Sequence, residues 1–198
     1  MSDLKNIRGK RVLVRVDFNV PIEFTVHSSQ FTVLDDSRIK AAVPTIQFLI
    51  KKSAKVILMM HFGRPAAKRE SGIRNQELGT IVERLSRLLK KEVQLIKEWD
   101  FEDIEKEVKR LKAGDILMLP NLRLHHGEEK NNIVFSKQLA ALGDLYVNEA
   151  FSASHRKHAS LVGVPTFLHG YAGLQLIKEI ETLDRVLHEP ARPLIVLM

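Results

Sequence analysis

The sequence contains no cysteine among its 198 residues. Disulfide bonds and cysteine-ligated metal centres are therefore excluded, and secretion gains no support. The residues that follow Met1 lack the apolar core of a signal peptide. No apolar stretch approaches the roughly 20 residues that are needed to cross a bilayer. These absences predict a soluble, cytoplasmic chain without a membrane partner.

Several catalytic and binding motifs are absent as well. Neither the phosphate-binding pattern G-x-x-x-x-G-K-[ST] nor the dinucleotide pattern G-x-G-x-x-G follows any strand-like segment. No nucleophile elbow, zinc-finger spacing, aromatic RNA-binding motif or helix-turn-helix pair is recognisable. The sequence therefore contains no motif that would bind a nucleotide or supply a covalent nucleophile.

Acidic residues are fewer than basic ones: the sequence has 24 acidic and 31 basic residues, and its net charge is +7. A basic surface binds nucleic-acid phosphates, but it also gathers small anions into clefts. Much of the basic charge falls in helix-like segments such as 83–91 and 105–112, where solvent-exposed helix faces explain it. Charge alone does not identify the partner, and nucleic-acid binding is the least favoured hypothesis for it.

Short apolar segments alternate with segments of helical periodicity. The apolar segments are continuous rather than alternating, which is typical of parallel strands buried on both faces. Strand–helix alternation predicts a doubly wound, Rossmann-like α/β fold with a mostly parallel sheet flanked by helices. The predicted strands are 11–16, 55–60, 93–96, 115–119 and 144–148, and the predicted helices are 35–52, 75–91, 100–112 and 135–143.

Three local features refine this prediction. An Asp is expected to cap the first helix, and Pro44 should either kink that helix or precede its core. Residues 24–34 predict a surface hairpin of two short strands around the polar loop 27–30. After residue 172 a long amphipathic helix is expected, followed by an apolar strand that includes residues 194–198.

Basic and hydrogen-bonding residues follow the predicted strands. Carboxyl ends of parallel strands share one edge of the sheet, where ligands bind in such folds. Arginine presents a planar fork that matches carboxylate and phosphate oxygens, so this edge predicts a pocket for a small ligand with two anionic ends. The residues at this edge are Asp17, Asn19, Arg38, His61, Arg64, Asn121, Arg123, Glu149, His155, Arg156 and His158.

Simpler interpretations exist for each residue alone. A single Arg or His after a strand is commonly a solvated loop residue, and Asp17 is equally compatible with an ordinary turn. The pairs His125–His126 and His155–His158 suggest metal ligands, but zinc requires three or four converging ligands and no cysteine is present. A metal site is therefore not predicted.

Five segments in order resemble one known family: RVLVRVDFNVP, DDSRIKAAVPTIQFLI, AKVILMMHFGRP, GDILMLPNLRLHHGEEKN and DLYVNEAFSASHRKHASLVGV. The chain resembles the N-terminal domain of phosphoglycerate kinases from about residue 5 to its end. The resemblance implies a single N-terminal lobe of a two-lobed glycolytic kinase. It implies a substrate-binding domain at 1–172, an interdomain helix at 173–189, and the first strand of a nucleotide-binding domain at 190–198.

The resemblance also implies a function and partners. The N-terminal lobe would bind 3-phosphoglycerate or 1,3-bisphosphoglycerate, and the C-terminal lobe would bind Mg-ADP or Mg-ATP. Closure of the two lobes would allow direct phosphoryl transfer between 1,3-bisphosphoglycerate and ADP. The chain alone is expected to show no turnover, to hold neither nucleotide nor metal, and to be a monomer unless the strand at 194–198 promotes self-association.

Seven residues match the substrate contacts of that family. By resemblance, Arg38 contacts the transferring phosphoryl group and is the candidate catalytic residue. Asp17 and Asn19 would take the hydroxyl and carboxylate end of the substrate. The far phosphate would be held by His61, Arg64, Arg123 and Arg156.

The sequence also departs from the family pattern. Ser152 replaces a glycine and Pro120 replaces a glutamate, so the loop around residue 152 is expected to change near the ligand or the hinge. The hairpin at 24–34 is longer than usual. A second hypothesis is therefore a non-catalytic module that binds phosphoglycerate or another small dianion.

Overall fold

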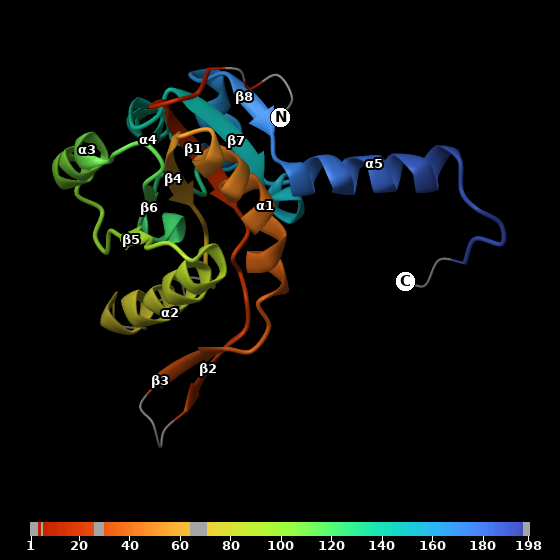
Figure 1. Cartoon of the computed structure of the whole chain (residues 1–198), viewed down its shortest axis with the longest axis horizontal. Coiled ribbons are helices and arrows are strands. Elements are labelled where there is room, and N and C mark those ends of the chain that lie inside the picture. Colours follow the sequence, from red (N-terminus) through yellow and green to blue (C-terminus); the bar gives the residue numbers. More distant parts are fainter. Residues whose placement is uncertain (1–3, 5, 26–29, 64–70, 196–198) are drawn as a thin grey trace.

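A six-stranded sheet forms the centre of the computed structural model, which describes residues 4, 6–25, 30–63 and 71–195. Every strand pair in this sheet is parallel, and the order is β5-β6-β4-β1-β7-β8 (Figure 1). The strands are β1 Arg11–Val16, β4 Lys55–Met59, β5 Gln94–Leu95, β6 Ile116–Met118, β7 Leu145–Glu149 and β8 Gly170–Ala172. The doubly wound α/β prediction is confirmed.

Four helices cover the two faces of the sheet. Helices α1 Ser37–Lys51 and α2 Ser71–Leu89 pack on one face, where Val14 of β1 meets Ile46 of α1 and Leu85 of α2 in one buried cluster. Helices α3 Phe101–Arg110 and α4 Ile133–Ala141 pack on the other face against Leu13 and Ile57. Both faces of β1 are therefore buried, which explains its apolar run from Val12 to Val14.

A two-stranded antiparallel hairpin extends below the sheet (Figure 1), made of β2 Ile22–Thr25 and β3 Gln30–Val33. The aromatic rings of Phe24 and Phe31 face each other with centroids 4.9 Å apart. The predicted pair of strands is thus present, although β2 begins at Ile22 and Gln30, which was expected in the loop, belongs to β3. Residues 27–29 of the predicted loop lie outside the described residues.

Some boundaries differ from the predictions. Helix α2 begins at Ser71, four residues before the predicted start at Asn75. Helix α1 begins before Pro44 and continues through it, although this proline cannot donate a hydrogen bond to the helix. Asp36 lies at the N-cap of α1 but makes no capping bond, because its carboxylate pairs with Lys40 and Arg84. Strand β8 was not predicted, since its three residues form no apolar run.

Short helical turns connect these elements near the carboxyl edge of the sheet. They are the 3₁₀ turns η1 Leu122–Leu124, η2 Phe151–Ala153 and η4 Val164–Thr166, and the π-helical turn η3 Ala159–Gly163.

Helix α5 Leu174–His188 projects away from the rest of the chain (Figure 1). Only Leu176 of this helix is buried, whereas Ile180, Leu183 and Leu187 are exposed. The described residues 190–195 are not assigned to a strand, and residues 196–198 of the predicted strand lie outside the description. An extended segment needs a neighbouring strand to complete its hydrogen bonds, and no strand pairs with 190–195. None of the helices in the described ranges has the length and apolar character to span a membrane.

Candidate anion-binding site

The candidate site lies at the carboxyl edge of the sheet, where strand order changes direction. Strand β1 lies between β4 and β7, so the chain leaves β1 on one side and returns to it on the other. Such switch points open a crevice beyond the strand ends. Asp17 follows β1 at this crevice, and the turn η2 follows β7.

Asp17 connects three segments at this edge. One carboxylate oxygen, Oδ2, accepts from Nη1 of Arg38 and from Oγ of Ser152. The other oxygen accepts the backbone N–H of Asn19 at 3.2 Å. Burial alone would raise the pKa of Asp17, but these hydrogen bonds and the charge of Arg38 outweigh it and lower the pKa below its usual value. Asp17 is therefore an ionised acceptor that orients Arg38, whose side chain stays 49% exposed.

A second group of contacts joins the loop after β4 to the turn η1. Asn19 accepts the backbone N–H of Gly63 at 3.1 Å, and Nη1 of Arg123 donates to the carbonyl oxygen of Gly63. Asn121 holds the same loop, since its side chain accepts from Phe62 N–H at 3.1 Å and donates to Phe62 O at 2.9 Å. Hydrogen bonds thus join the loops after β1, β4 and β6 at one place.

His61 is buried and uncharged. Its pKa falls from 6.5 to about 3 because burial disfavours the charged ring and because Arg15 and Arg123 add positive charge nearby. Nη2 of Arg15 lies 2.7 Å from His61 Nδ1. Arg156 is half-buried, and its charge also lowers the pKa of His61, which places it at the same edge.

Six of the seven predicted contacts are thus placed at one edge of the sheet, and the seventh, Arg64, lies outside the described residues. His155 is exposed there. His158 faces the buried Glu128, with its Nδ1 3.8 Å from Oε1. Among the described residues, no group of three or more His, Asp or Glu side chains is arranged to hold a metal ion. His125 instead stacks on Phe135 at a centroid distance of 3.8 Å.

Glu149 forms its hydrogen bonds with Thr45 and with the start of helix α5. Its Oε1 accepts from Thr45 Oγ1 at 2.5 Å and from Gln175 N–H at 3.1 Å, and its Oε2 accepts from Leu176 N–H at 3.4 Å. Thr45 Oγ1 accepts from Leu174 N–H at 2.9 Å. These two side chains satisfy the first three N–H groups of α5, which have no partner inside the helix.

A pocket of about 280 Å³ separates this anchor from Arg38. Its walls come from α1, the turn η2 and α5, and they include Asp17, Arg38, Ser152 and Gln175. The candidate site is therefore directly adjacent to the base of α5.

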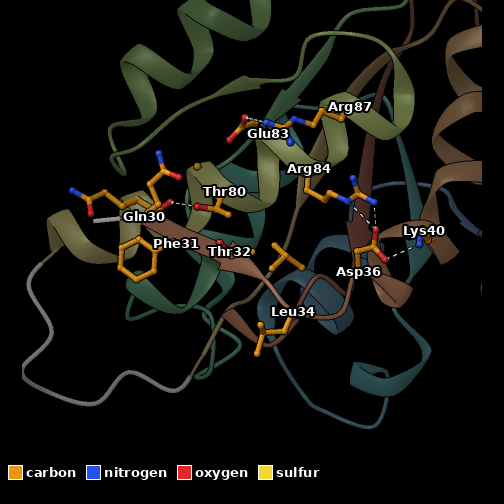
Figure 2. A pocket seen from close by; sticks show the side chains of 13 residues that line it. Gln30, Phe31, Thr32, Leu34, Asp36, Lys40, Thr80, Glu83, Arg84 and Arg87 are labelled. Carbon is orange, nitrogen blue, oxygen red and sulfur yellow. Dashed lines mark hydrogen bonds and ion pairs between the residues drawn. The ribbon is translucent and has the colours of Figure 1, made fainter. Parts of the chain in front are cut away.

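A wider groove of about 860 Å³ lies between β3 and α2 (Figure 2). Its three cations share two carboxylates: Arg84 donates to Asp36 Oδ2 at 2.5 and 2.8 Å, and Lys40 lies 2.9 Å from Asp36 Oδ1. Arg87 pairs with Glu83 at 2.5 Å. Each of these groove cations pairs with a carboxylate, and the described residues predicted for the anion site do not line this groove.

Several residues that shape the site were not assigned a role from the sequence. Arg15 lies inside the apolar run of β1, where a strand pattern gives no reason to single it out. Ser160 contacts it from 145 positions away in the chain, and Glu128 contacts Ser160 in turn. Ser152 was noted only as a departure, and its bond to Asp17 depends on the approach of η2 to the end of β1.

Comparison with known proteins agrees with this architecture. The family model for phosphoglycerate kinase matches residues 1–198. Phosphoglycerate kinase of Coprothermobacter proteolyticus is 45% identical over 187 residues, which cover 94% of this chain and 46% of that protein. The enzyme of Moorella thermoacetica is 44% identical over 198 residues, covering 100% of this chain and 48% of that protein.

Solved structures give the same result. Phosphoglycerate kinase from Coxiella burnetii aligns with a TM-score of 0.79 and 36% identity, over 98% of this chain and 46% of its own. The enzyme from Pyrococcus horikoshii OT3 aligns with a TM-score of 0.80 and 31% identity, over 96% and 46%. The chain spans about half the length of the relatives that it matches. With a family match along its whole length, this chain belongs to the phosphoglycerate kinase family.

Proposed function

We propose that this chain is the half of a phosphoglycerate kinase that binds 3-phosphoglycerate and 1,3-bisphosphoglycerate. The observation that carries the proposal is the hydrogen-bonded carboxyl edge of the sheet. There Asp17 pairs with Arg38, and the backbone of Gly63 bonds to both Asn19 and Arg123. The site thus offers cations and a polar acceptor side by side. A ligand that carries a phosphate, a carboxylate and a hydroxyl group fits this combination.

The residues divide the ligand between them. Arg123 and Arg156, with Arg64 by sequence, hold the phosphate that is not transferred, and His61 donates a neutral hydrogen bond to it. Asp17 accepts the hydroxyl hydrogen, and Asn19 lies beside the carboxylate. Arg38 is exposed at the opening of the site, so its guanidinium is the group that meets the transferring phosphoryl group and neutralises its developing charge.

The reaction would be a direct in-line transfer. The carboxylate oxygen of 3-phosphoglycerate attacks the γ-phosphorus of ATP, the bond from that phosphorus to the ADP oxygen breaks, and 1,3-bisphosphoglycerate and ADP result. In the other direction ADP attacks the acyl phosphate. The protein supplies orientation and charge rather than a covalent intermediate. Mg-ADP or Mg-ATP is the second substrate, and we assign its binding to the lobe that makes up the other half of the relatives.

Calorimetric titration of 3-phosphoglycerate into this chain tests the substrate assignment, with inorganic phosphate as the comparison ligand. We expect saturable binding of 3-phosphoglycerate that is tighter than binding of phosphate. Arg123→Ala and Arg156→Ala should each weaken it about 10- to 100-fold, the effect of losing one charged hydrogen bond to the ligand phosphate. Arg110→Ala, which removes an exposed arginine paired with Glu107 at 2.6 Å, is the matched control and should change nothing.

Equal affinity for both ligands, or equal losses for Arg110→Ala and Arg123→Ala, would overturn the assignment. A coupled assay with 3-phosphoglycerate and Mg-ATP separates the enzyme half from a non-catalytic binding module. The chain alone should not turn over. Turnover that appears when the other half is added would support the enzyme, and retained binding without any turnover would support the module.

A further inference from the structure

The buried side chain of Arg15 in strand β1 forms hydrogen bonds that reach the candidate site. Its side chain is fully buried, and all its donors point into the protein. Nε donates to Ser160 Oγ at 3.0 Å, Nη1 donates to the carbonyl oxygen of Val16 at 2.6 Å, and Nη2 lies 2.7 Å from Nδ1 of His61. The guanidinium therefore links the core to a residue of the candidate site.

The contact between Arg15 and His61 determines where the histidine proton lies. An arginine side chain has five N–H donors and no acceptor, and it stays protonated in proteins. The partner atom Nδ1 must therefore accept the hydrogen bond through its lone pair. A histidine whose Nδ1 accepts carries its hydrogen on Nε2 and has no charge.

The side chain of Arg15 is held in place by Ser160, which is in turn bonded to Glu128. Ser160 Oγ accepts from Arg15, so its own hydrogen is free to go to Glu128, whose Oε1 lies 2.6 Å away. The backbone N–H of Ser160 donates to the other oxygen of Glu128 at 3.0 Å. Glu128 and Ser160 are both fully buried. A directed chain of hydrogen bonds thus connects Glu128, Ser160, Arg15 and His61.

We propose that Arg15, anchored by Ser160 and Glu128, is a positioning residue that fixes His61 as an uncharged donor with its hydrogen on Nε2. In this arrangement the free edge of the ring presents a hydrogen to an anionic ligand without adding charge. The identity of that ligand rests on the proposed function, whereas the state of the ring does not.

The other charges around His61 act in the same direction. Arg15 reaches it from β1, Arg123 from η1 and Arg156 from the loop after η2, while Asp17 is the one carboxylate among its strongest electrostatic neighbours. On Arg15 itself the strongest electrostatic influences come from Glu128 and Tyr146, followed by Asp17 and Arg123. Together with burial, the three arginines keep the pKa of His61 at about 3, so the ring stays neutral in mildly acidic solution.

Nitrogen-15 NMR of the full chain without ligand tests the inference. Long-range correlation spectra distinguish a protonated ring nitrogen from an unprotonated one. Between about pH 5 and pH 8, His61 should keep its hydrogen on Nε2 and should not titrate. A hydrogen on Nδ1, or titration of His61 near 6.5, would overturn the proposal.

Variants identify the residue that holds the ring. Arg15→Met alone leaves Glu128 buried without its counter-charge, so it is combined with Glu128→Gln to remove both charges. In this double variant, and less strongly in Ser160→Ala, the titration midpoint of His61 should rise by more than one pH unit, or a second tautomer should appear. Ser136→Ala is the control, because it removes another fully buried serine whose hydroxyl donates to Asn132 O at 2.9 Å. An unchanged ring in a folded double variant would show that Arg15 does not fix it.

Binding measurements keep the two proposals separate. The affinity of the double variant for 3-phosphoglycerate, divided by that of the unmodified chain, should rise as the pH falls from about 8 to about 5, because only the variant gains a charged ring. Dividing by the unmodified chain removes the titration of the phosphate itself, whose second pKa is about 6. If 3-phosphoglycerate does not bind at all, the proposed substrate fails, while the NMR result still decides the role of Arg15.

Discussion

Asp17 and Arg38 form an ion pair at the carboxyl edge of the sheet, joining the loop after β1 to the first turn of α1. The same carboxylate oxygen accepts the hydroxyl hydrogen of Ser152. The proposed hydroxyl acceptor and the proposed catalytic arginine are therefore set relative to each other before any ligand arrives.

The proposed role of Asp17 as acceptor for the ligand hydroxyl can be tested by removing its charge. Asp17→Asn should weaken 3-phosphoglycerate binding about 10- to 100-fold, because a charged acceptor for the ligand hydroxyl is lost. Binding of inorganic phosphate, which needs no such acceptor, should stay equal or improve as a negative charge is removed. Titration calorimetry measures both. Asp144→Asn is the control, since Asp144 pairs with Arg11 at 2.7 Å at the amino end of β1 and should affect neither ligand. Equal weakening of both ligands by Asp17→Asn would contradict the assigned role.

Asn121 is expected to be a structural residue of the site. It is buried and bonded to Phe62 and Arg123, so Asn121→Ala leaves backbone groups without partners and should lower the free energy of unfolding by about 2–4 kcal/mol. Urea unfolding measures this loss. The control Asn75→Ala removes one 3.3 Å bond to Glu98 and should cost less than about 1 kcal/mol. Similar losses for the two variants would be evidence against this role.

Glu149 should make stability depend on pH in an unusual direction. Burial raises its pKa above 4.5 in the folded chain, against the opposing effect of hydrogen bonds from Thr45 and from the N–H groups of α5. The folded state therefore binds this proton more tightly than the unfolded state, and the associated stability is present below pH 4.5 and is lost as the pH rises through the folded pKa. The stability of the chain relative to Glu149→Gln should accordingly fall between about pH 4 and pH 8.

Asp144 provides the opposite case. Its hydrogen bonds with Arg11 lower its pKa in the folded chain, so its contribution is present above 3.8 and is lost as the pH falls through the lowered pKa. Urea unfolding from about pH 3 to about pH 8 compares the two variants. Parallel pH profiles for Glu149→Gln and Asp144→Asn would refute this account.

Two glycines should respond to alanine in opposite ways. A methyl group at Gly173 would lie 1.7 Å from Glu149 Oε2, so Gly173→Ala must displace the anchor of α5 and should cost about 2 kcal/mol or more. A methyl group at Gly79, inside α2, would meet nothing within 4 Å, so Gly79→Ala should stabilise the chain by about 0.5–1 kcal/mol. Thermal unfolding measures both, and a stabilising Gly173→Ala would contradict the close packing at Glu149.

The sheet was predictable because its long strands carry a strong signal. Strands β1 and β4 are continuous apolar runs, and a run buried on both faces is rarely anything else in an alternating α/β chain. Strand β8 was not, because Gly170–Ala172 is a strand only through its pairing with β7. The start of α2 was misplaced for a similar reason, since propensity alone gives weak signals at helix ends.

The residues of the candidate site were predictable from the sequence, but the contacts between them were not. Strand ends indicated Asp17, Asn19, His61 and Arg123, because parallel strands bring their carboxyl ends together. Which of them touch depends on packing, and Ser160 reaches Arg15 across 145 positions of sequence. Glu149 belongs to the same edge by position, yet its carboxylate serves α5, because Gly173 leaves room for it there.

The anchoring of α5 has a mechanical consequence. With 15 residues and a rise of 1.5 Å per residue, the helix is a rigid lever about 22 Å long. The base of the helix is held by the carboxylate of Glu149. Ser152, which donates to Asp17, lies three positions after Glu149 in the chain. A rotation of about 10° at this base displaces the far end of the lever by about 4 Å. Any change in the orientation of α5 at its base would therefore produce its largest displacement at the far end, at His188.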